Sequence, residues 1–172
     1  LFAFQYPAPG SLALAERVKD MLAPLDVKLD QSWGLDHGTW SVLAHVFPDA
    51  DIPIVQLSID RSKPNQFHYA LGKKLAALRD EGVLIIGSGN VVHNLPLINW
   101  QQNTTYDWAT RFEQSVKDFL AHNAHPALID YDKLGHDAQL SIPTPEHYLP
   151  LLYIMGAQRE GDRVQFPIEG IE

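Results

Sequence analysis

Apolar residues recur at helical spacing in five segments of the chain. The first segment follows Ser11, a residue type that caps helices well, and ends before Pro24. The last follows Thr144 and Pro145, a cap residue and a proline that suit the start of a helix. The apolar faces of the predicted helices run from Leu14 to Leu22, Trp40 to Phe47, Phe67 to Leu78, Trp108 to Leu120 and Tyr148 to Met155.

Short apolar runs between these helices indicate strands. Ile52 to Ile59 and Val83 to Ile86 flank the third helix, and shorter alternations occur at Val27 to Leu29 and Val164 to Ile168. A strand, a helix and a second strand in this order form a right-handed unit with parallel strands. Runs as apolar as these suit strands that are covered on both faces. The pattern therefore predicts an α/β fold, and a chain of 172 residues suits a single domain.

Composition and charge exclude several classes of partner and site. The net charge of -8 provides no basic surface for nucleic acid or anionic lipid. The sequence has no apolar stretch that could span a bilayer, and its first residues lack the basic region of a signal peptide, so we expect a cytoplasmic protein. Because there are no cysteines, any metal must be held by His, Asp or Glu.

The turn after the predicted strand Val83 to Ile86 is the first place to look for chemistry. Ligands of open α/β sheets bind beyond the carboxyl ends of the strands, and this turn leads to His93. A dinucleotide fingerprint would need glycine where Val92 stands. A serine nucleophile elbow would need glycines on both sides of Ser88, two residues away, and has none. Neither NAD binding nor serine hydrolysis is favoured.

Two other histidines lie in suggestive surroundings. His37 stands between Asp36 and Gly38, where a carboxylate could orient the imidazole, and His147 follows the predicted helix start at Thr144. Taken alone, each local sequence fits a surface histidine better than a site residue, and His93 fits a packed histidine as well as a functional one. The other histidines lie in helices or polar loops that carry no recognisable motif.

Four ordered segments nevertheless resemble one family, the class III extradiol ring-cleavage dioxygenases, in the branch of the 4,5-DOPA dioxygenases. The resemblance extends along essentially the whole chain. Its motifs are Trp33-Gly34-Leu35-Asp36-His37-Gly38-Thr39-Trp40, Pro48-Asp49-Ala50-Asp51-Ile52-Pro53 with Gln56-Leu57-Ser58-Ile59-Asp60, Ser88-Gly89-Asn90-Val91-Val92-His93-Asn94-Leu95, and Pro143-Thr144-Pro145-Glu146-His147-Tyr148-Leu149-Pro150-Leu151.

This resemblance implies a fold and an activity. The expected fold is a three-layer α/β/α domain with a central, largely parallel or mixed sheet, forming one catalytic domain over residues 1–172. The expected cofactor is one divalent metal, Fe(II) for catalysis, although Zn(II) can occupy the site. By resemblance, His147 is a metal ligand, His93 lies at the metal as ligand or acid/base, and His37 is a second acid/base. The expected substrates are O₂ and a small aromatic diol such as DOPA, acted on by a monomer or small homo-oligomer.

The sequence also departs from the family pattern. Members begin with a His-Gly-Ser-Pro motif and carry a second histidine after a strand, both supplying metal ligands, and neither is present here. We therefore expect the remaining ligands to precede Leu1, and the last strand of the pattern to be missing. Two alternatives stay open: a zinc-occupied homologue without catalysis, and a metal-dependent hydrolase that turns over without O₂.

Overall fold

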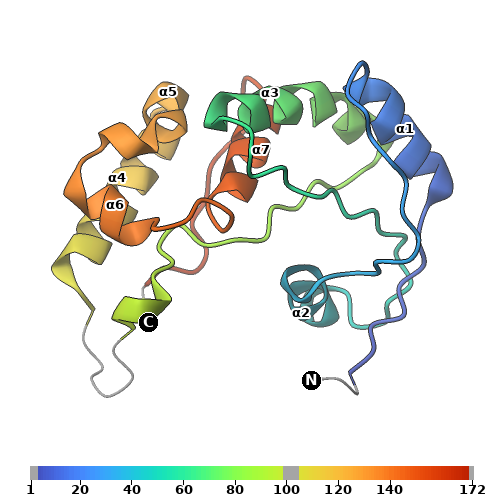
Figure 1. The fold of residues 1–172 in the computed structure, drawn as a ribbon, viewed down its shortest axis with the longest axis horizontal. Coiled ribbons are helices and arrows are strands. Elements are labelled where there is room, and N and C mark those ends of the chain that lie inside the picture. The colour runs from blue at the N-terminus through green and yellow to red at the C-terminus, as the bar shows by residue number, and fades with distance from the viewer. Residues whose placement is uncertain (1–3, 99–104, 171–172) are drawn as a thin grey trace. The chain divides into compact units, whose positions relative to one another are not determined.

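The computed structural model describes residues 4–98 and 105–170 of the chain. The chain divides into two compact units, Leu1–Ile59 and Asp60–Glu172, and each is described by itself. Figure 1 labels the helices in chain order.

The first unit contains helices α1 (Leu12–Leu22) and α2 (His37–Val46). The hydroxyl of Ser11 accepts a hydrogen bond from the Leu14 amide at 3.2 Å, so the predicted cap of α1 is confirmed. The segments between and around these helices are loops and turns. The Ile54 amide donates to the Pro9 carbonyl at 2.9 Å, beside an isolated parallel bridge between Gly10 and Ile54.

The second unit is organised around two closely packed helices, α3 (Asn65–Leu75) and α7 (Leu149–Ala157). A short 3-10 helix, η1 (Ala76–Glu81), continues α3. The two α-helices approach closely because each presents a glycine to the other. A Cβ atom at Gly72 would lie 2.2 Å from the Tyr153 carbonyl oxygen, and one at Gly156 would lie 2.2 Å from that of Tyr69.

The remaining elements of this unit are short apart from one helix. They are η2 (Leu95–Leu97), α4 (Asp107–Ala121), α5 (His125–Ile129), η3 (Tyr131–Lys133) and α6 (His136–Ser141). Helices α4, α5 and α6 bury Phe112, Val116, Leu128 and Ala138. The region from α5 to α6 is largely helical. None of the helices among the described residues has the length and apolar character needed to cross a membrane.

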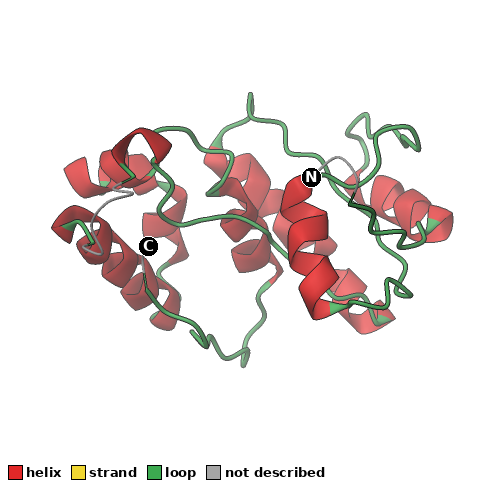
Figure 2. Cartoon of the chain, turned by 90° about the horizontal axis from the view of Figure 1, so that it is seen from below, coloured by secondary structure: helices red, strands yellow, loops and turns green. Residues whose placement is uncertain are grey.

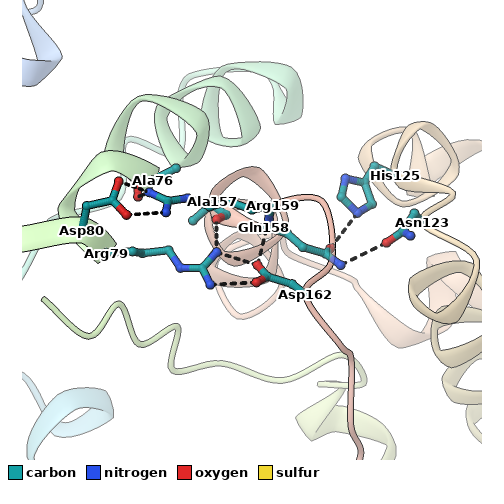
Figure 3. A network of polar contacts seen from close by, with 9 residues as sticks. All are labelled: Ala76, Arg79, Asp80, Asn123, His125, Ala157, Gln158, Arg159 and Asp162. Atoms are coloured by element: carbon teal, nitrogen blue, oxygen red, sulfur yellow. Dashed lines mark hydrogen bonds and ion pairs between the residues drawn. The ribbon is translucent and has the colours of Figure 1, made fainter. Parts of the chain in front are cut away.

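Two crossed ion pairs hold the chain that leaves α7 against η1 (Figure 3). Arg79 makes two hydrogen bonds to the carboxylate of Asp162 and a third, at 2.9 Å, to the Ala157 carbonyl. Arg159 binds the carboxylate of Asp80 at 2.6 and 2.7 Å. The Arg79 guanidinium, helped by the Arg159 amide, lowers the pKa of Asp162 to about 2. The Arg159 guanidinium likewise lowers the pKa of Asp80, so both carboxylates are charged at neutral pH.

The predicted α/β/α fold is wrong for the described part of the chain. This part is about 49% helical with 1% strand and no sheet, and Figure 2 shows helices joined by loops. Residues 83–86 are outside any helix or ladder, and the side chains of Leu84 and Ile86 are 69% and 47% exposed. Apolar alternation favours an extended backbone, but a strand also needs a neighbouring backbone to exchange hydrogen bonds with. The sequence pattern carries no information about that neighbour.

Candidate metal centre

The structure brings two of the three predicted site histidines into contact. The imidazole rings of His93 and His147 are stacked, with centroids 3.6 Å apart and planes inclined at 22°. His93 lies just before η2, and His147 lies in the turn before α7. Both side chains are partly buried. Segments far apart in the sequence thus converge on one pair of nitrogen-donor side chains.

Backbone contacts hold the two segments together at His93 and at Asn90, three residues before it. The His93 amide donates to the Ser141 carbonyl at 2.8 Å, and the Asn90 amide donates to the His147 carbonyl at 2.8 Å. At Gly89 a Cβ atom would lie 2.2 Å from that same His147 oxygen. Only glycine lets the two backbones come this close.

The side chain of Asn94 adds a further contact at the end of α6. Its Nδ2 donates to the Leu140 carbonyl at 2.7 Å in a partly buried position. Leu140 and Ser141 are in the last turn of α6, where backbone carbonyls have no partner within the helix. Asn94 and the His93 amide therefore satisfy two adjacent carbonyls at this helix end.

The residue before His147, Glu146, is a carboxylate that lies near an arginine. The Thr144 hydroxyl donates to Oε1 of Glu146 at 2.8 Å, and Arg61 Nη1 lies 3.6 Å from Oε2. The Thr144 hydrogen bond, with a smaller contribution from the Arg61 charge, lowers the pKa of Glu146. Glu146 is therefore an anion beside His147 at neutral pH. The segment is a turn rather than the predicted helix start, since α7 begins at Leu149.

His37, the third predicted residue, is the first residue of α2 and is exposed. It belongs to the first unit, whereas the histidine pair belongs to the second. The neighbouring Asp36 caps the helix, because its carboxylate accepts the Thr39 amide at 2.9 Å. The carboxylate beside His37 thus has a structural role as the cap of α2.

The donor chemistry of the pair fits a divalent metal in part. Imidazole nitrogens bind Fe(II) and Zn(II) well. Catalytic sites generally use three protein ligands, and residues 4–98 and 105–170 contain no group of three or more His, Asp or Glu side chains placed to hold a metal. Two imidazoles alone do not complete a site of this kind.

Other candidates among the described residues lie apart from this pair. His125 is hydrogen-bonded on both ring nitrogens, to Tyr69 and to Gln158, at 3.0 Å each. A hollow of about 350 Å³ in the first unit is lined by residues that include Phe4, Tyr6 and Trp40, and none of the three predicted histidines lines it. No pattern in the sequence indicates the contacts of Asn94 or Arg61, because their partners are distant in the chain.

Comparison with known proteins identifies the family. The chain matches the family described as catalytic LigB subunit of aromatic ring-opening dioxygenase over residues 1–170, and it belongs to that family. The resemblance found in the four motifs is confirmed.

Two individual relatives within this family are similar to the chain over nearly its whole length. The chain is 52% identical over 179 residues to the 4,5-DOPA dioxygenase extradiol of Escherichia coli (strain K12), covering 100% of this chain and 65% of that relative. It is 38% identical over 168 residues to the 4,5-DOPA dioxygenase extradiol of Beta vulgaris, covering 96% of this chain and 63% of that relative. The chain thus spans less than two thirds of the length of these curated relatives.

A solved structure is similar as well. The crystal structure of an uncharacterized protein from Escherichia coli K12 has a TM-score of 0.90 and 52% sequence identity to this chain. The match covers 99% of this chain and 72% of that chain.

Proposed function

We propose that the full-length protein is a metal-dependent extradiol dioxygenase that opens the ring of a catechol such as DOPA. The observation that carries this proposal is the contact between His93 and His147 in a member of the LigB family. Two relatives that cover nearly the whole chain are named 4,5-DOPA dioxygenase extradiol, which supports DOPA or a close analogue as the substrate.

In this proposal His93 and His147 bind one divalent metal, Fe(II) for catalysis, through neutral imidazole nitrogens. When bound, the metal supplies open positions for the catechol oxygens and O₂ and makes the catechol easier to deprotonate. The hydrogen bonds to Ser141 and Asn90 hold the two histidine segments in place. The Glu146 carboxylate next to His147 adds negative charge that favours a bound cation.

Proton transfer is assigned to His37, with His93 as the other candidate. Imidazole is the side chain best suited to exchanging protons near neutral pH. In this role His37 takes a proton from a catechol hydroxyl and returns it as the ring opens. Both atoms of O₂ enter the product, so the reaction needs no external reductant.

Substitution of each histidine in the full-length protein tests these roles. We expect His93→Ala and His147→Ala to lower iron content and to abolish O₂ uptake with DOPA. His37→Ala should keep its iron while turnover falls about 10²- to 10⁴-fold, as for loss of a general acid or base. The control is His136→Ala, at an exposed position of α6.

The outcomes separate the roles. Full activity and iron content in both His93→Ala and His147→Ala would refute the proposed centre. Loss of iron in His37→Ala with unchanged turnover per bound iron would refute its acid/base role.

A further inference from the structure

Asn94 is the residue next to His93, and its side chain is bound to the same helix end as the His93 backbone. The Asn94 amide donates to the Leu140 carbonyl at 2.7 Å, and the His93 N–H donates to the Ser141 carbonyl at 2.8 Å. Two hydrogen bonds to adjacent carbonyls restrain the orientation of this segment more than one bond would.

The end of α6 also leads directly to the other histidine. Ser141 is the last residue of α6, and the chain continues from it through a turn to His147. The same helix end therefore anchors both rings: His93 through hydrogen bonds, and His147 through the covalent chain. We propose that Asn94 is a positioning residue that holds the His93 ring against the His147 ring.

A separate hydrogen bond holds the beginning of the segment from Asn90 to Asn94, so the Asn94 side chain restrains only its end. The Asn90 amide donates to the His147 carbonyl at 2.8 Å, and this contact does not involve Asn94. Removal of the Asn94 amide should loosen the His93 end while the Asn90 end stays attached. The expected effect is loss of the ring contact within a folded protein.

The chain offers a matched control for this test. The Nδ2 atom of Asn65 donates to the Ile129 carbonyl at 2.8 Å, again in a partly buried position and at the end of a short helix, α5. Asn65→Ala therefore removes the same kind of bond from the same unit. It leaves the contacts of His93 and His147 unchanged.

The experiment compares Asn94→Ala, Asn94→Asp and Asn65→Ala with the unaltered full-length protein. The first readout, in metal-free protein, is the NMR cross-relaxation between the ring protons of His93 and His147. The second is Zn(II) affinity, measured by competition with a chromophoric chelator. We expect both Asn94 variants to lose the ring signal and to bind Zn(II) about 10- to 100-fold more weakly, as is typical when a residue that orients a ligand is removed. Asn65→Ala should retain both properties.

Retention of the ring signal and of Zn(II) affinity in either folded Asn94 variant would overturn the inference. The Asp variant keeps the size of the side chain but replaces the donor with a charged carboxylate that repels the Leu140 carbonyl, so its ring signal decides the matter if the Ala variant fails to fold. The significance of this contact for catalysis depends on the proposed function, but the ring signal does not. If the unaltered protein bound no metal, the proposed function would fail, while the ring signal would still decide the role of Asn94.

Discussion

Gly89 is the position where the two histidine segments come closest. A methyl group there would lie 2.2 Å from the His147 carbonyl oxygen, the atom that accepts the Asn90 amide. Because the clashing atom belongs to the backbone, the His147 carbonyl cannot move aside without breaking its hydrogen bond to the Asn90 amide. We predict that Gly89→Ala costs about 1–3 kcal/mol of unfolding free energy and weakens Zn(II) binding, measured by denaturant unfolding and chelator competition.

Gly10→Ala provides the comparison. Nothing lies within 4 Å of a Cβ atom at Gly10, so this variant should behave like the unaltered protein in both assays. Equal stability and equal Zn(II) affinity in the Gly89 and Gly10 variants would contradict the proposed close approach.

At the residue scale, motifs in the sequence selected His93 and His147, whose rings the structure brings into contact. They could not reveal how the pair is held, because the carbonyls of Leu140 and Ser141 have no signature in the sequence. The role of Asp36 was open in the sequence for a related reason. A carboxylate before a helix can cap that helix or face a neighbouring imidazole, and the sequence does not distinguish the two.

Helices α3 and α7 enclose the most deeply buried histidine. His68 is 0% exposed, and its Nδ1 lies 3.0 Å from the Tyr153 hydroxyl. Burial lowers the pKa of His68, although the Lys63 backbone and the charge of Asp60 oppose the effect. The folded protein therefore holds this ring in its neutral form.

Acid should weaken the packing of these two helices. An unfolded histidine takes up a proton as the pH falls below about 6.5, while folded His68 resists protonation, so the unfolded state gains stability. We predict that the free energy of unfolding falls as the pH is lowered from 7.5 to 5.5. His68→Gln should be less stable at pH 7.5 but lose less on acidification. Parallel pH profiles for the two proteins would contradict this role for His68.

At the scale of elements, a capping residue marked a helix start correctly in one case and not in another. Ser11 precedes α1 as predicted. The helix start predicted at Thr144 was wrong, because the threonine hydroxyl donates to Glu146 and α7 begins only at Leu149. The predicted strands do not form a sheet in the described part of the chain. An apolar run describes one side of a pairing, and the described part of the chain supplies no neighbour for residues 83–86.

At the scale of the whole molecule, the family was evident from the order of four motifs, whereas the layered fold was not observed. A single catalytic domain over residues 1–172 stays a prediction. The assignment of proton transfer to His37 stays a proposal, and the histidine substitutions test it directly.

The central claim is that the full-length protein opens a catechol ring with O₂ at a metal held by His93 and His147. The most direct measurement follows O₂ and product together after Fe(II)-loaded, full-length protein is mixed with DOPA in aerated buffer. We expect equal consumption of O₂ and DOPA, and a ring-opened product that contains both oxygen atoms by mass spectrometry. The His93→Ala protein should not carry out this reaction. DOPA that remains intact, or O₂ consumption that yields only an unopened quinone, would contradict the central claim.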